Sequence, residues 1–85
     1  MDDIGGWRSK IDEIDERIVE LMNQRASCAI EIGRIKEASG IDIENLSREA
    51  DVLGHIAAIN SGPLQSDTLE TVFRTIIEAC KRLEM

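Results

Sequence analysis

Apolar residues recur every three or four positions along the first part of the chain, which is the spacing of one face of an α-helix. This stripe, called the seam below, consists of Ile4, Trp7, Ile11, Ile14, Ile18, Leu21, Arg25, Cys28, Ile32 and Ile35. No proline interrupts it, and Gly40 supplies a helix stop. We therefore expect one helix over residues 6–38, with a weak start at Gly5 and Gly6. Gly33 inside this helix costs about 1 kcal/mol relative to Ala unless another element packs closely there.

A second amphipathic pattern predicts a helix over residues 46–60. It begins near Asn45 or Ser47, both favourable N-cap types, and the turn-forming stretch Asn60-Ser61-Gly62-Pro63 ends it. Its inner face carries Val52, Leu53, Ile56 and Ile59.

A third pattern predicts a helix over residues 67–84. Asp67 is the expected N-cap, with Glu70 at the capping-box position. The inner face carries Leu69, Val72, Phe73, Ile76, Ile77, Cys80 and Leu83. With no strand, repeat or low-complexity segment predicted, the fold class is all-α, as one domain over residues 1–85.

The first helix is too long for a compact chain of this size. At 1.5 Å per residue it spans about 50 Å. A chain of 85 residues has an expected radius of gyration of only about 12 Å. The two short helices cannot cover the whole seam, so we expect a second copy to cover the rest, in an intertwined two-fold homodimer. A solitary coiled-coil spacer is the alternative, and the two amphipathic helices beside the seam argue against it.

Composition narrows the class of ligand. Seventeen acidic and ten basic side chains give a net charge of −7, which argues against nucleic acid as a partner. A small anion is compatible with this balance if the few cations gather in one pocket. One Phe, one Trp and no Tyr, beside many Ile, Leu, Ala and Glu residues, favour helix over sheet.

Neither a metal nor another cofactor is expected. Cys28 and Cys80 lack the paired spacing of zinc or redox sites, and the chain has one histidine. Both cysteines are therefore interpreted as reduced packing residues. No signal-peptide run and no membrane-spanning segment is evident, so the cytoplasm is the expected location.

Three cations on the first helix suggest a shared binding site. Arg25 occupies a seam position, where burial without an anionic partner is costly. Lys36 lies eleven residues further on, in nearly the same direction and about 16 Å along the axis. Arg8 lies about 25 Å from Arg25, so it reaches the same small ligand only from an antiparallel partner helix. The alternatives are a carboxylate partner or a snorkelling side chain for Arg25, and a solvated surface position for Arg8.

Arg48 and Glu49 open the second helix. Glu49 suits the positive end of the helix dipole, whereas Arg48 does not and requires another reason to be there. The alternative for Arg48 is a surface ion pair with Glu44 or Asp51.

Several motifs in order along the chain resemble the all-helical chorismate mutases. They are Trp7-Arg8, Ile11-Asp12-Glu13-Ile14-Asp15, Asn23-Gln24-Arg25, Ile32-Gly33-Arg34-Ile35-Lys36, Arg48-Glu49, Asn60-Ser61-Gly62-Pro63-Leu64 and Phe73-Arg74-Thr75-Ile76-Ile77-Glu78. The resemblance implies a homodimer of three-helix protomers in which chorismate rearranges to prephenate, toward phenylalanine and tyrosine. It also implies fusion to, or a complex with, another enzyme of the aromatic pathway as one form in which such chains occur.

The resemblance also implies a role for each residue. Arg25 and the partner's Arg8 resemble the arginines that hold the two substrate carboxylates, and Arg48 resembles an additional cation near them. Lys36 resembles the donor to the ether oxygen of the breaking bond. Glu49 resembles the carboxylate that accepts a hydrogen bond from the ring hydroxyl.

Three positions of the substrate site depart from the usual family pattern. Asn45 stands where Asp is common and caps a helix about equally well. Cys80 replaces a small polar residue at the substrate edge and is a poorer donor; its alternative role is packing. Glu84 stands where many relatives have a Gln that donates to the ether oxygen. An ionised Glu84 cannot donate, so we expect a protonated form and activity that rises as pH falls, with a frayed chain end as the alternative.

Two other functions remain open on the sequence. An isochorismate pyruvate-lyase shares the fold and uses similar cations. A regulatory or dimerisation module on the same scaffold is the non-enzymatic alternative, and the full set of cations argues against a complete loss of activity.

Overall fold

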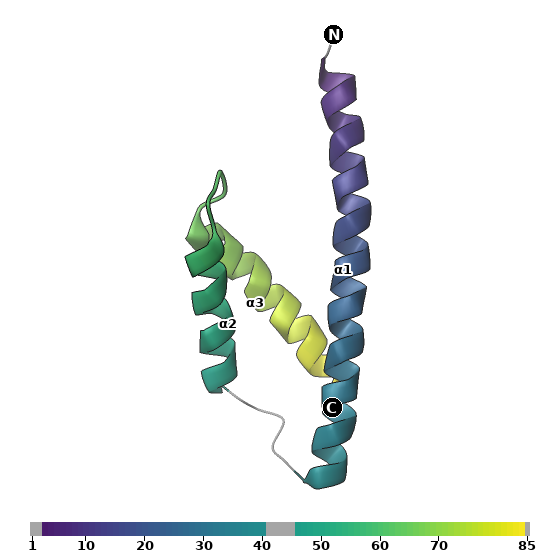
Figure 1. Ribbon diagram of the computed structural model, residues 1–85, viewed down its shortest axis with the longest axis vertical. Helices are drawn as coiled ribbons and strands as arrows, with labels where there is room; N and C mark the ends of the chain where they lie inside the picture. Colours follow the sequence, from purple (N-terminus) through teal and green to yellow (C-terminus); the bar gives the residue numbers. More distant parts are fainter. Residues whose placement is uncertain (1–2, 41–45, 85) are drawn as a thin grey trace.

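Three helices make up the part of the chain that the structure describes, which is residues 3–40 and 46–84 of a computed structural model. They are α1 (Ile4–Ser39), α2 (Leu46–Ile59) and α3 (Ser66–Leu83), and no strand occurs in these ranges (Figure 1). The prediction of an all-α chain with one long N-terminal helix is confirmed.

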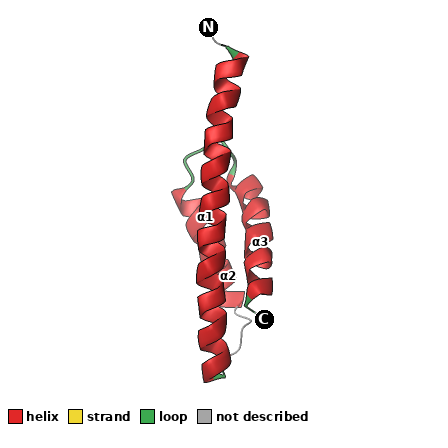
Figure 2. Cartoon of the chain, turned by 90° about the vertical axis from the view of Figure 1, so that its right-hand side faces the viewer, coloured by secondary structure: helices red, strands yellow, loops and turns green. Residues whose placement is uncertain are grey.

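The length of α1 determines the shape of the molecule. Its 36 residues correspond to about 54 Å, and the molecule measures 58 × 23 × 15 Å. The radius of gyration is 16.2 Å, well above the value of about 12 Å for a compact chain of this length. Figures 1 and 2 show α2 and α3 beside the middle of α1, whereas its first turns extend beyond them.

The two ends of α1 are both capped. The Asp3 side chain accepts a hydrogen bond from the Gly6 N–H at 3.0 Å, so the helix begins ahead of the two glycines. The expected weak start at Gly5 and Gly6 is therefore wrong, because the Asp3 cap compensates for their conformational freedom. At the other end Gly40 has φ 71° and its N–H donates to the Lys36 carbonyl, which confirms the predicted stop.

The starts of α2 and α3 differ from the predicted caps. Ser47 is the second residue of α2 and therefore not its cap, and Asn45 lies outside the described residues. α3 has Gln65 as its N-cap, without a side-chain cap bond, so the expected capping role of Asp67 is wrong. The Asn60 amide donates to the Leu64 carbonyl and to Ser66 Oγ, which holds the turn so that the helix begins at Ser66.

The described chain buries very little of itself. α3 contacts both other helices, but no Cα pair of α1 and α2 lies within 8 Å in the described ranges. Only Ala29, Gly33 and Cys80 are buried there. Cys80 is thus the packing residue expected, whereas Cys28 is exposed, and both thiols are free.

Gly33 marks the closest approach between α1 and α3. A Cβ atom at this position would lie 2.8 Å from Glu84 Cα and 2.9 Å from its carbonyl oxygen. These atoms belong to backbone and cannot turn aside. The close neighbour expected at Gly33 is therefore present, and it is the end of α3.

The seam remains exposed along the N-terminal half of α1. Its large side chains there are 46–69% exposed: Ile4, Trp7, Ile11, Ile14, Ile18 and Leu21. Contiguous apolar faces of this kind are typical of interaction surfaces. None of the described helices combines the length and apolar character needed to cross a membrane.

Candidate active site

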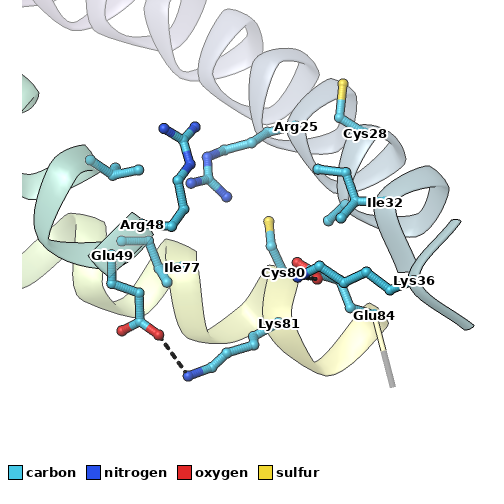
Figure 3. A pocket seen from close by; sticks show the side chains of 12 residues that line it. Arg25, Cys28, Ile32, Lys36, Arg48, Glu49, Ile77, Cys80, Lys81 and Glu84 are labelled. Carbon is cyan, nitrogen blue, oxygen red and sulfur yellow. Dashed lines mark hydrogen bonds and ion pairs between the residues drawn. The ribbon is translucent and has the colours of Figure 1, made fainter. Parts of the chain in front are cut away.

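A cavity of about 370 Å³ lies between the C-terminal half of α1, the first turns of α2 and the last turns of α3. α1 contributes Arg25, Cys28, Ala29, Ile32 and Lys36; α2 contributes Arg48, Glu49 and Val52; α3 contributes Ile77, Cys80, Lys81 and Glu84 (Figure 3). Six of the eight residues predicted for the site from the sequence are among these. The fold therefore brings together side chains that lie up to 59 positions apart, from Arg25 to Glu84.

The cavity is positive although the chain is negative. Four cations and two carboxylates line it, which gives a formal charge of +2 in a chain of net charge −7. Concave surfaces lined by one sign of charge focus the electrostatic potential and concentrate ligands of opposite charge. The expectation that the few cations gather in one pocket therefore holds for Arg25, Lys36 and Arg48, with Lys81 as a fourth.

An ion pair between α1 and α3 closes one end of the cavity. Lys36 Nζ lies 3.2 Å from Glu84 Oε1, and the two side chains are only 19% and 15% exposed. The contact depends on the close approach at Gly33, one turn before Lys36, because that approach brings the backbone of Glu84 onto α1. The alternative of a frayed end at Glu84 is wrong, since its side chain is held in this pair.

A second ion pair joins α2 to α3. Lys81 Nζ lies 2.9 Å from Glu49 Oε2, with side chains 21% and 26% exposed. Lys81 was missing from the residues predicted for the site. The available signal was that Lys81 lies four residues after Ile77, a residue of the predicted inner face of α3.

Arg25 lines the cavity without a counter-charge from the described residues. It is half-buried, and no described residue forms a hydrogen bond or an ion pair with its side chain. The carboxylate partner considered from the sequence is therefore absent from the described chain. In Figure 3 the guanidinium groups of Arg25 and Arg48 extend toward the same part of the cavity. A partly desolvated guanidinium in this position favours an anionic ligand.

The remaining predicted residues lie elsewhere or differ in exposure. Arg8 is exposed on the N-terminal half of α1, about 25 Å along the helix from Arg25, and it does not line the cavity of its own chain. Asn45 lies outside the described residues. Cys80 is 6% exposed and lines the cavity on the α3 side. Within the described ranges, no group of three or more His, Cys, Asp or Glu residues could hold a metal ion.

Comparison with known proteins decides the family. A family model described as chorismate mutase type II matches residues 7–85, nearly the whole chain. The chain belongs to the chorismate mutase type II family. The resemblance noted from the sequence motifs is thereby confirmed.

Individual members of the chorismate mutase type II family show the same relationship. The chain is 41% identical over 88 residues to the bifunctional chorismate mutase/prephenate dehydratase of Stutzerimonas stutzeri, a match that covers 98% of this chain and 24% of that protein. It is 32% identical over 78 residues to the chorismate mutase of Methanocaldococcus jannaschii, covering 91% and 79%. The chain thus spans about a quarter of the length of the bifunctional relatives it matches.

The three-dimensional comparison agrees. The structure of chorismate mutase (Form II) from Thermus thermophilus superposes with a TM-score of 0.92 and 29% sequence identity. The superposition covers 94% of this chain and 91% of that one. The chain therefore shares with this chorismate mutase both the order of its helices and their arrangement.

Proposed function

We propose that the chain is a single chorismate mutase domain that rearranges chorismate to prephenate as an intertwined homodimer. The observation that supports this best is the positive cavity in which Arg25 has no counter-charge from the described residues. Chorismate is a dianion, and its charge matches the formal charge of +2 on the cavity. The volume of about 370 Å³ lies in the range of small-molecule sites.

The arginines bind the carboxylates of the substrate. A guanidinium presents its N–H donors in a planar fork that fits a carboxylate in a bidentate manner. Arg25 holds one carboxylate, and Arg48 adds a cation on the same side of the cavity. The partner's Arg8 holds the other carboxylate, because Arg8 lies too far along α1 to reach the cavity of its own chain.

Lys36 and Glu84 act at the ether oxygen of the breaking bond. The rearrangement is unimolecular, so the protein has to hold a compact chair-like conformer and stabilise the negative charge that develops on this oxygen. The Lys36 ammonium donates to the oxygen directly. Glu84 can donate a hydrogen bond to this oxygen only when its carboxyl group carries a proton.

Glu49 and the α3 side of the cavity complete the binding of the ring. Glu49 Oε2 is paired with Lys81, which leaves Oε1 to accept a hydrogen bond from the ring hydroxyl. Cys80 contributes packing at the edge of the substrate. Asn45, which precedes α2, is proposed to support the same side of the site.

The exposed seam supports the dimer. Six large apolar side chains on the N-terminal half of α1 are uncovered in one chain, and an antiparallel second copy would bury them. The same arrangement brings the partner's Arg8 to the cavity that contains Arg25. An antiparallel dimer therefore accounts both for the exposed apolar face of α1 and for the second arginine that the substrate carboxylates require.

Subunit mixing tests the shared site. Arg8→Ala and Arg25→Ala homodimers should each lose about 100-fold or more in kcat/KM, the usual effect of removing one donor from a preorganised site. After subunit exchange, each heterodimer should contain one intact site, so a mixture should recover up to about a quarter of wild-type activity at statistical pairing.

The outcomes of this experiment are distinct. Verified exchange without recovery of activity contradicts the shared site. Identification of prephenate as the product supports the mutase, whereas release of pyruvate from isochorismate would favour the lyase. A chain that acts on neither compound would be a binding or dimerisation module.

A further inference from the structure

The two ion pairs of the cavity differ from the other ion pairs of the described chain. Arg34–Glu31, Arg74–Glu70 and Arg82–Glu78 each join residues three or four apart on one helix, with side chains 49–75% exposed. Surface pairs of this kind contribute little. Lys36–Glu84 and Lys81–Glu49 instead join different helices, and their side chains are 15–26% exposed. The cavity pairs therefore fix side-chain positions that solvent would otherwise leave variable.

Lys81 and Glu49 occupy favourable ends of their helices. Glu49 lies in the first turn of α2, where the helix dipole is positive, and Lys81 lies in the last turn of α3, where it is negative. Each charge is therefore stabilised by its own helix as well as by the other charge. This places the carboxylate of Glu49 firmly on the α3 side of the cavity.

The direction of the Glu49 side chain matters because Arg25 lines the same cavity. In Figure 3 the Glu49 carboxylate points to Lys81 and away from the Arg25 guanidinium. Arg25 has no ion pair among the described residues, so it would be the natural alternative partner for a released carboxylate. Such a pair would neutralise the cation that a substrate carboxylate requires.

We infer that Lys81 is a positioning residue that holds Glu49 away from Arg25 and so keeps Arg25 available for an anionic ligand. This inference rests on the proposed function, because the ligand in question is the dianion chorismate. Lys81 does not touch the substrate in this account. It acts through Glu49, which would otherwise compete with the substrate for the same guanidinium.

Kinetics of the full chain with Lys81→Met test the inference. Methionine keeps the length of the side chain and removes its charge. The KM for chorismate should rise about tenfold, a typical size for coupled charges, while kcat changes less than about twofold. Competition for Arg25 weakens binding of the substrate and its transition state alike, which is why the effect should appear in KM.

A second substitution distinguishes this role from a merely structural one. Glu49→Gln removes the competing charge, so Lys81→Met should change KM by less than about twofold when added to Glu49→Gln. Lys81→Arg keeps the cation and should keep the wild-type KM. Arg82→Met is the matched control, because it removes the neighbouring cation of the same helix from an exposed pair outside the cavity.

The outcomes separate a failure of the inference about Lys81 from a failure of the proposed function. If Lys81→Met leaves KM unchanged, or if its effect persists in full beside Glu49→Gln, Lys81 does not act through Glu49. Lys81 also does not act through the charge pair with Glu49 if Lys81→Arg raises KM as much as Lys81→Met does. If Lys81→Met fails to fold, a raised KM in Lys81→Arg still contradicts the inference. A wild-type chain that does not convert chorismate overturns the proposed function, and the inference about Lys81 with it.

Discussion

The two halves of α1 are built from the same heptad-like pattern but are covered in different ways. The N-terminal half presents Ile, Trp and Leu side chains that are 46–69% exposed, and its first turns extend beyond the other two described helices. In the C-terminal half the buried positions are Ala29 and Gly33, and the end of α3 lies directly on Gly33. Small residues allow two backbones of one chain to approach closely, whereas large exposed ones provide apolar area for a second molecule.

A charged side chain in the seam should disrupt the dimer contact of the N-terminal half of α1. In Ile14→Asp an apolar side chain, 47% exposed in one chain, becomes a carboxylate that the dimer would have to bury. We expect the dissociation constant of the dimer to rise about 100-fold or more, from lost apolar burial and an unpaired charge. Sedimentation velocity would measure this, with Ser9→Asp on the opposite face of α1 as control. Unchanged mass and activity would show that the seam is not an interface.

A methyl group added at Gly33 should disturb the packing of α3 against the C-terminal half of α1. In Gly33→Ala the new Cβ would lie 2.8 Å from Glu84 Cα, so the end of α3 must move away from α1. We expect a loss of about 1–3 kcal/mol in stability from overpacking, and a fall of about tenfold in kcat as Glu84 moves from Lys36. Thermal melts and steady-state kinetics would measure both.

Gly54→Ala provides the matched control for Gly33→Ala. A Cβ at Gly54 meets no atom within 4 Å, so this substitution should stabilise α2 by about 0.5–1 kcal/mol through its helix propensity. If the two alanine variants had the same stability and the same kcat, the close approach at Gly33 would not be required for activity.

The pH profile of activity provides the most specific test of Glu84 at the end of α3. Only protonated Glu84 can donate to the ether oxygen, so wild-type activity should rise as pH falls, by at most tenfold per pH unit for one proton. Glu84→Gln donates at every pH and should give a flat profile between about pH 5 and 8. Glu78→Gln, in an exposed pair on α3, should keep the wild-type slope. A flat wild-type profile would exclude Glu84 as the donor.

Local pattern was sufficient to predict the helices and part of the cavity. The seam spacing identified α1, and Gly40 identified its end, because both depend on residues close in sequence. The eleven-residue interval between Arg25 and Lys36 placed both on one face, and both line the same cavity. Periodicity along a single helix contains this information.

The periodicity along a single helix could not predict contacts between helices. Lys81 was not predicted as a site residue because its meaning depends on Glu49, 32 positions away on another helix. The start of α3 was misplaced for a similar reason: the Asn60 side chain bonds to Leu64 and Ser66 across the turn, and this overrides the capping preference of Asp67. In both cases a side chain outside the local pattern decides the result.

The sparse interior of the described chain has a consequence for how the protein folds. With only Ala29, Gly33 and Cys80 shielded from solvent, a solitary chain retains few contacts that could offset its conformational entropy. Association and folding would then be one coupled event, and the melting temperature should increase with protein concentration. Dilution alone would unfold such a molecule.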